Sequence, residues 1–165
     1  MEEQPENHGI LAGIKEVQCD DALSGDLSYA FYACKNVEKI TLSNTSAVTN
    51  LYYAFQKCAK LETLNEIDCG NVTFISYAFN ECWELANMGG LKNLGKSFTV
   101  ADSVNLQACS KLTHESALNI LNGLYDLKGN GITSIQPTVA FSTATSSLLT
   151  STEKAIGTNK GWKIT

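Results

Sequence analysis

The sequence contains one motif three times at a fixed interval. Tyr-Ala-Phe-x-x-Cys begins at Tyr29, Tyr53 and Tyr77, so each copy starts 24 residues after the one before. Apolar residues recur in the same phase, two positions before each motif and three after its cysteine: Leu27, Leu51 and Ile75, then Val37, Leu61 and Leu85. A fixed period of this length is typical of repeat architectures, in which each repeat buries its apolar face against its neighbours. The spacing therefore predicts a short solenoid of stacked repeats.

The stretch after each motif has the pattern of a strand. Within 37–42, Ile40 and Leu42 are apolar with one polar residue between them, which is the alternation of a half-buried strand. A polar turn at 43–46 follows. We expect each repeat to form a short helical turn at Tyr-Ala-Phe-x-x-Cys and then a short strand. The strands should pair in parallel into one sheet, with the helical turns on the other side, so the predicted fold class is α/β.

The repeat pattern weakens at both ends of the array. Residues 1–9 are an acidic lead-in, and residues 10–27 are predicted to form a degenerate first repeat that caps the stack. After the third motif the period is broken, because Cys109 lies 27 residues after Cys82. We interpret this as a stretched fourth repeat, which places the whole solenoid at 10–112.

Residues 113–165 predict a C-terminal α+β segment that caps the array. Thr113 is placed to cap a helix that ends near the turn at 128–131, and residues 132–141 are expected to be extended. Thr150 begins a capping box for a second helix, and 162–164 is expected to be a last strand. Covering the open edge of the sheet would prevent edge-to-edge association. The whole chain is expected to be one domain.

The six cysteines predict a ladder of buried thiols rather than disulfides. Three of them share one repeat position, so stacking should bring each beside the next, and Cys109 should extend the row. A free cysteine behaves as a small buried hydrophobe. There is no C-x-x-C pair, so we expect no zinc site, no redox site and no cofactor.

Composition excludes several classes of partner. The net charge is −5, and all twelve basic residues are lysines. Arginine is the preferred side chain for phosphates and base edges, so nucleic-acid binding is disfavoured. No stretch approaches the roughly 20 apolar residues of a membrane-spanning helix, so no membrane insertion is expected.

The motif together with the segment Leu61-Glu62-Thr63-Leu64-Asn65-Glu66-Ile67-Asp68-Cys69-Gly70-Asn71-Val72-Thr73 resembles the BspA-like group of leucine-rich repeats. The segments 112–116 and 156–162 resemble the capping end of phage-type versions. The resemblance implies a protein of a bacterial surface or a phage tail, located outside the cell, on its surface or on the virion. It also implies binding or assembly rather than catalysis, with no catalytic residues to carry over.

The best binding candidates are the exposed positions of the repeat strands, which parallel pairing would bring together on one face. They are Glu38, Lys39, Thr41, Glu62, Thr63 and Asn65. Two hypotheses remain open: a recognition or adhesion module that binds a protein or a glycan through this face, or a structural assembly or spacer component that contacts only neighbouring chains.

Catalysis has little support in the sequence. His8 and His114 are the only histidines, and neither has a titratable partner placed by a motif. The in-phase tyrosines and phenylalanines are expected to pack in the core rather than to form a sugar-stacking platform. Tyr52 and Trp83 are out of phase with that core, which makes them better candidates for the surface.

Overall fold

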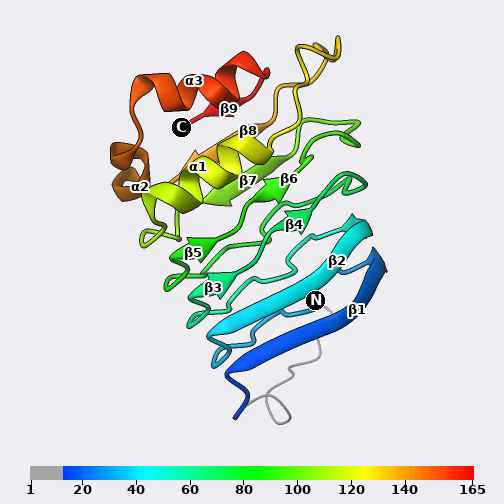
Figure 1. Cartoon of the computed structure of the whole chain (residues 1–165), viewed down its shortest axis with the longest axis vertical. Helices are drawn as coiled ribbons and strands as arrows, with labels where there is room; N and C mark the ends of the chain where they lie inside the picture. The colour runs from blue at the N-terminus through cyan, green and yellow to red at the C-terminus, as the bar shows by residue number, and fades with distance from the viewer. Residues whose placement is uncertain (1–12) are drawn as a thin grey trace, which may run out of the picture.

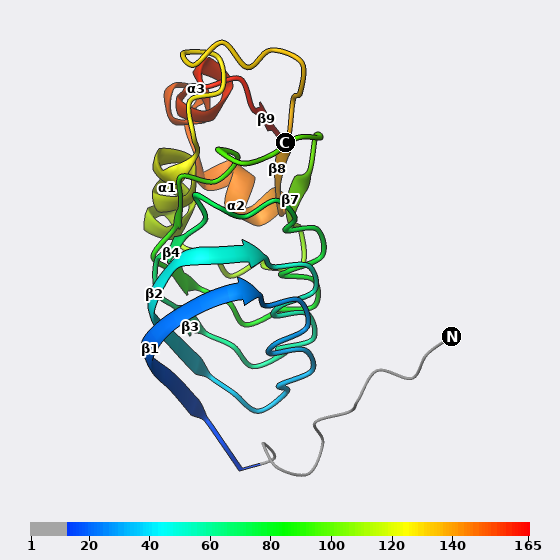
Figure 2. The ribbon, with the colours of Figure 1, turned by 90° about the vertical axis from the view of Figure 1, so that its right-hand side faces the viewer.

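The structure is a computed structural model and describes residues 13–165. The chain winds through successive layers that rise from the N-terminal to the C-terminal end (Figure 1). Each layer has one segment on a strand side and one on a return side, where the Tyr-Ala-Phe-x-x-Cys motifs lie (Figure 2). The predicted lead-in at 1–9 and His8 lie outside the described residues. The elements are β1 (Glu16–Asp26), β2 (Lys39–Asn50), β3 (Thr63–Leu64), β4 (Ile67–Asp68), β5 (Asn87–Met88), β6 (Leu91–Lys92), β7 (Ser103–Leu106), α1 (His114–Gly123), β8 (Thr138–Phe141), α2 (Thr143–Leu148), α3 (Ser151–Asn159) and β9 (Lys163–Ile164).

The strand side is built from parallel pairs whose register equals one repeat. Lys39 pairs with Thr63, and Thr63 pairs with Asn87. The prediction of a single sheet is wrong, because the strands form a sheet ordered β1-β2-β3-β5, a separate pair β4-β6, and a third sheet β7-β8-β9. The first two are separate because Asn65 and Glu66 interrupt the strand between β3 and β4. The third belongs to the return side.

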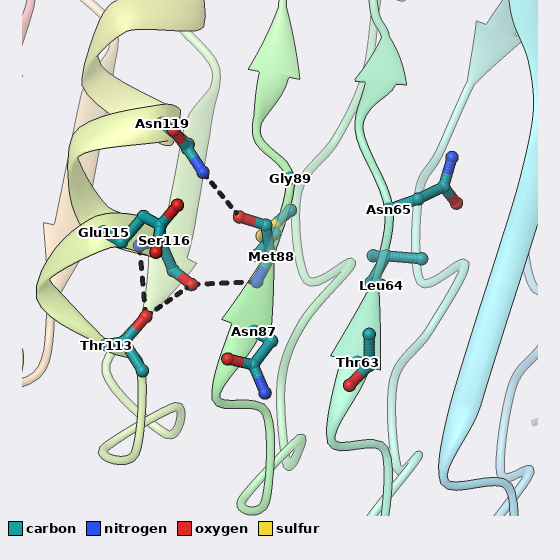
Figure 3. A pocket seen from close by; sticks show the side chains of 10 residues that line it. All are labelled: Thr63, Leu64, Asn65, Asn87, Met88, Gly89, Thr113, Glu115, Ser116 and Asn119. Carbon is teal, nitrogen blue, oxygen red and sulfur yellow. Dashed lines mark hydrogen bonds between the residues drawn. The ribbon is translucent and has the colours of Figure 1, made fainter.

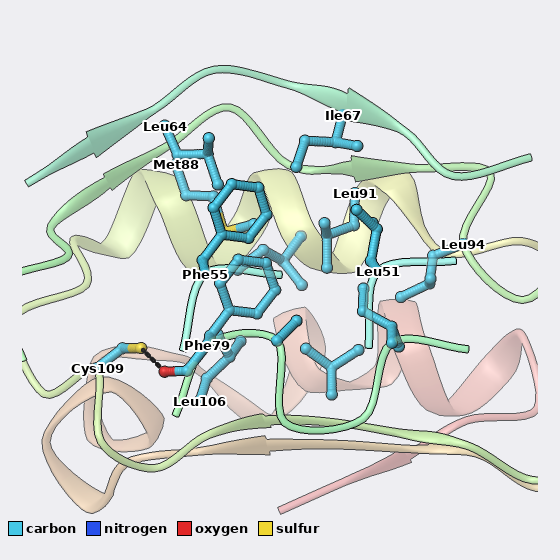
Figure 4. Packing of buried hydrophobic residues seen from close by; sticks show 14 of the residues in the cluster. Leu51, Phe55, Leu64, Ile67, Phe79, Met88, Leu91, Leu94, Leu106 and Cys109 are labelled. Atoms are coloured by element: carbon cyan, nitrogen blue, oxygen red, sulfur yellow. Dashed lines mark hydrogen bonds between the residues drawn. The ribbon is translucent and has the colours of Figure 1, made fainter. Parts of the chain in front are cut away.

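The core lies between the two sides, and the apolar residues that share a repeat phase fill it. Val37, Leu61 and Leu85 are fully buried. Phe55 and Phe79 stack in parallel, with ring centroids 5.6 Å apart (Figure 4). The predicted repeat register is therefore confirmed by burial at equivalent positions.

The motif itself is not a helical turn, and that part of the predicted fold class is wrong. Its backbone N–H groups alternate between two kinds of acceptor: Phe31 donates to Ala54 in the next layer, whereas Tyr32 donates within its own layer to Tyr29. This alternation requires the left-handed region of φ at two residues per motif: Tyr29, Ala33, Tyr53, Lys57, Tyr77 and Glu81, with φ between 58° and 64°. Non-glycine residues adopt that conformation at some cost, which the hydrogen bonds between layers offset.

The cysteine ladder is present, and all six cysteines are free thiols. Successive thiols lie within hydrogen-bonding distance of phenylalanine carbonyl oxygens of the preceding layer: Cys58 Sγ to Phe31 O (3.0 Å), Cys82 Sγ to Phe55 O (3.1 Å) and Cys109 Sγ to Phe79 O (3.6 Å). The last of these is drawn in Figure 4. Each thiol therefore ties one layer to the one before it.

The C-terminal part continues the winding, with α1 and α3 on the strand side (Figure 2). Helix α1 lies beside β5 and β6 (Figure 1), and β8 and β9 pair in parallel with β7 on the return side (Figure 2). The predicted N-cap at Thr113 and the capping box of Thr150 and Glu153 are both present. Helix α1 ends at Gly123 rather than near 128–131, because Leu124 bridges to Leu94 in the neighbouring layer. Helix α2 was not predicted.

Candidate ligand-binding groove on the strand side

The strand side presents rows of outward side chains that follow the repeat register. In β2, Ile40 and Leu42 point into the core, whereas Lys39 is exposed and Thr41 is half-buried. The parallel pairing places Lys39, Thr63 and Asn87 side by side in one row. This arrangement brings the predicted candidates of two repeats onto one face, as parallel pairing requires.

Two of the predicted binding residues already have partners in the first layer. Glu38 forms an ion pair with Lys15, and Lys39 approaches Glu16 at 3.8 Å. The hydrogen bond and the charge of Glu38 raise the pKa of Lys15 above its ordinary value. Because both pairs are exposed to water, each contributes little to stability. Glu62, one layer further on, is exposed, and its side chain has no hydrogen bond or ion pair within residues 13–165.

The side chain of Asn65 is hydrogen-bonded to the backbone of the neighbouring layer. Its Nδ2 donates to the carbonyl oxygen of Leu42 at 2.8 Å, and its Oδ1 accepts from the Leu42 N–H at 2.8 Å. Nδ2 also donates to Glu66 O at 3.0 Å. Asn65 therefore joins two layers where the strand is interrupted, and its amide donors are not free for a ligand.

A second row of equivalent positions ends at a glycine that lines a hollow. The row runs through Gln18, Thr41 and Asn65 and reaches Gly89 in the layer of β5. A Cβ atom at Gly89 would lie 2.3 Å from the backbone nitrogen of Glu66. Glycine is therefore required at this position by close backbone approach, and Gly89 lines a depression in the face beside β3 and β5.

Helix α1 forms the far wall of this depression (Figure 3). The Ser116 hydroxyl accepts from the Met88 N–H at 2.9 Å and donates to Ala86 O at 2.9 Å. Asn119 Nδ2 approaches Met88 O at 3.4 Å. These contacts replace the bonds that another strand would make with β5. They hold the helix against the edge of the sheet and leave a groove of about 290 Å³.

Three polar side chains of the groove have no hydrogen-bond partner within residues 13–165. They are Thr63 on β3, Asn87 on β5 and Glu115 in the first turn of α1. Together they offer a hydroxyl, an amide and a carboxylate, which are both donors and acceptors of hydrogen bonds. No aromatic side chain or lysine lines the groove. This composition suits a polar, uncharged or cationic group better than an anion.

The groove contains only part of the predicted site. Thr63 and Asn65 line it, whereas Glu38, Lys39, Thr41 and Glu62 lie elsewhere on the same face. Asn87 and Glu115 were missed. Asn87 could have been found, because it occupies the repeat phase of Lys39 and Thr63, but Glu115 belongs to a helix with no counterpart in the repeats.

The aromatic residues differ from the prediction in one respect. The phenylalanines of the second and third motifs are buried, but Tyr77 is 46% exposed. Tyr29, Tyr53 and Tyr77 stack face to face at the surface of the return side, with centroids 5.0 and 4.9 Å apart. Tyr52 is half-buried and packs edge-on against all three, whereas Trp83 is 53% exposed, as expected for a surface residue.

The described residues contain no arrangement typical of catalysis or metal binding. His114 hydrogen-bonds Glu153 at 2.9 Å, and this glutamate also caps α3. Hydrogen bonds from Thr150 hold the pKa of Glu153 below its ordinary value, so the carboxylate acts as a helix cap. Within residues 13–165 no group of three or more metal-ligating side chains is close enough to hold an ion.

A family model for the BspA-type leucine-rich-repeat region, with six copies, matches residues 13–121. The chain belongs to this family. The match begins before β1 and ends inside α1, so it includes every layer that contributes to the groove. Leucine-rich repeats of this type are in general non-enzymatic modules that mediate interactions at surfaces.

Comparison with curated proteins and comparison with solved structures each found no match. Among residues 13–165 no helix has the length and apolar character needed to cross a membrane.

Proposed function

We propose that this leucine-rich-repeat chain is a recognition or adhesion module of a bacterial surface or a phage tail, and that it binds a protein or a glycan through its strand side. It would act outside the cell, on the cell surface or on the virion. In this proposal the repeats form a rigid solenoid, and residues 113–165 cap its C-terminal end. The chain would have no catalytic role.

The observation that carries the proposal is the groove beside Gly89. It brings together three polar side chains, from β3, β5 and α1, that have no hydrogen-bond partner within residues 13–165. Such a site can bind a ligand by hydrogen bonds without a rearrangement of the repeats, because rigid packed layers hold its walls. A preformed site avoids part of the entropic cost of binding.

The test is binding of the fluorescently labelled protein to bacterial cells and to purified envelope proteins and glycans. The groove variant carries Asn87→Ala and Glu115→Gln. A matched control carries Asn122→Ala and Asp21→Asn, which remove one amide and one carboxylate from exposed positions outside the groove. We expect binding by the parent and the control, and a loss of about tenfold or more in the groove variant.

Equal binding by the groove variant and the control would contradict a groove-centred site. If none of the three proteins binds, the recognition proposal fails. The assembly hypothesis would then be favoured, because the outer edge of β1 has no partner strand within residues 13–165.

A further inference from the structure

The first layer of the stack lacks backbone bonds that the second and third layers accept from the layers before them. In the first and second motifs, three N–H groups donate to three carbonyl oxygens of the following layer, as Tyr53 does to Ser76, Phe55 to Ala78 and Lys57 to Asn80. The equivalent acceptors in the first layer are the carbonyl oxygens of Ser28, Ala30 and Tyr32. No backbone hydrogen bond reaches these three oxygens within residues 13–165.

The thiol ladder is incomplete at the same end. Each later ladder cysteine lies against a phenylalanine carbonyl oxygen of the layer before it, but Cys34 has no earlier layer within residues 13–165. Its thiol lies beside that of Cys58. The missing thiol–carbonyl contact of Cys34 is an observation separate from the three carbonyl groups. It indicates the same missing neighbouring layer.

The apolar residues of the first layer are also only partly covered. Phe31 is half-buried, whereas Phe55, one layer on, is fully buried. Cys19 is half-buried, whereas Leu42, its partner in β2, is 1% exposed. The motif rings are stacked in parallel between layers, so the outer faces of Tyr29 and Phe31 are in position to stack on a further pair of rings.

We propose that this N-terminal face binds one further leucine-rich repeat of the same kind, supplied by a partner protein and stacked in parallel on β1. Its motif N–H groups would donate to the carbonyl oxygens of Ser28, Ala30 and Tyr32. A carbonyl oxygen of its aromatic position would accept from Cys34. This surface is distinct from the groove of the proposed function.

Charge indicates what the partner strand carries. Four acidic residues lie on β1 (Glu16, Asp20, Asp21 and Asp26), and β1 contains no lysine. A partner strand with lysine is complementary, as Lys39 of β2 is to Glu16. A second copy of this chain in a head-to-head arrangement does not fit, because its acidic β1 and its unpaired carbonyl oxygens would face the same groups.

The test uses the chain's own second layer as the donor repeat. In a fusion protein, residues 37–60 replace residues 1–13 directly before Ile14, with Cys58→Ala in the added copy so that no thiol is introduced. The phase is preserved, because Ile14 has the repeat position of Val37. Cys19 reports whether the N-terminal face is covered, since it is half-buried while the other five thiols are buried. The quantity measured is the rate at which a maleimide modifies the Cys19 thiol.

We expect the fusion to slow modification of Cys19 by about tenfold or more relative to the parent, because reaction then requires local opening of the added layer. In a trans experiment, a synthetic peptide of residues 37–60 with the same Cys58→Ala change is expected to protect Cys19. The matched control peptide carries an N-methyl group on the Phe55 amide, which removes one donor and keeps every side chain. It should protect much less.

Unchanged reactivity of Cys19 in the fusion would overturn the proposal. Equal protection by the two peptides would overturn the assigned hydrogen bonds. Protection of the parent that increases with its own concentration would identify a second copy as the occupant instead. Faster modification after deletion of residues 1–12 would show that the chain's own N-terminal segment occupies the face, which also overturns the proposal.

Discussion

Gly89 is the residue at which the strand side changes from a regular row of side chains into a groove. Its backbone N–H donates to Leu64 O at 2.9 Å, as a strand residue does, yet a Cβ there would meet the backbone nitrogen of Glu66. The same residue therefore serves the packing of two layers and the shape of the candidate site.

Gly89→Ala should destabilise the protein and alter the groove together. The new methyl group would force the backbone of β5 away from Glu66, and overpacking of this kind costs roughly 1–3 kcal/mol. Urea unfolding measures the change in free energy. Gly13→Ala is the control, because a Cβ at Gly13 has no atom within 4 Å. Similar unfolding midpoints for the two variants would contradict the close approach described at Gly89.

Phe55→Ala should destabilise the protein more than Phe31→Ala. Both residues occupy the same motif position, but Phe55 is enclosed by rings of two layers and Phe31 by one. Removal of a fully buried phenylalanine costs about 3–5 kcal/mol, and a half-buried one costs less. Thermal unfolding of both variants gives the comparison. The stacking order would be wrong if Phe31→Ala were the more damaging change.

At the scale of the element, the motif on the return side combines a turn with a ladder between layers. Half of its backbone hydrogen bonds, its stacked rings and its thiol contacts join one layer to the next along the axis of the stack. Burial raises the pKa of the Cys82 thiol to about 12 and raises those of Cys69 and Cys109 as well. These thiols therefore resist ionisation while the protein is folded.

This predicts a loss of stability in alkaline solution. A thiol whose pKa is raised on folding stabilises the folded state fully below its ordinary pKa of 9.0, and that contribution falls as the pH rises from 9.0 towards 12. Urea midpoints at about pH 7.5 and about pH 10.5 should therefore differ, with the lower midpoint at high pH. The difference should be smaller in Cys82→Ala, because one of the buried thiols is removed. Equal midpoints at both pH values would contradict the buried ladder.

How much of the fold and of the candidate groove could be predicted from the sequence differs from one element to the next. The layers follow from periodicity, because in-phase residues such as Leu61 must be buried by equivalent neighbours. The turn type does not follow from the sequence, since Tyr53 and Lys57 have no intrinsic preference for positive φ. They adopt it so that their N–H groups reach the next layer. Helix α2 has six residues, without a clear apolar period. The groove depends on Asn119, which reaches the site only because α1 takes the place of a strand.

At the scale of the whole molecule, the two ends of the stack differ in chemistry. The C-terminal end is covered by α1, α3 and the β7-β8-β9 sheet, whereas the N-terminal end has unpaired carbonyl groups and half-buried apolar residues. Between them, the strand side carries polar rows and the groove, and the return side carries the tyrosine stack. In the two proposals, the array separates the ligand-binding groove from the end that binds a further repeat.

The central claim is that the chain recognises its ligand at the strand-side groove. It is tested most directly by hydrogen–deuterium exchange of the chain, alone and bound to whichever bacterial envelope component the labelled protein retains. Added protection is expected at 62–66, 87–89 and 113–119, which line or border the groove. Protection confined to the return-side motifs at 29–34, 53–58 and 77–82 would contradict it.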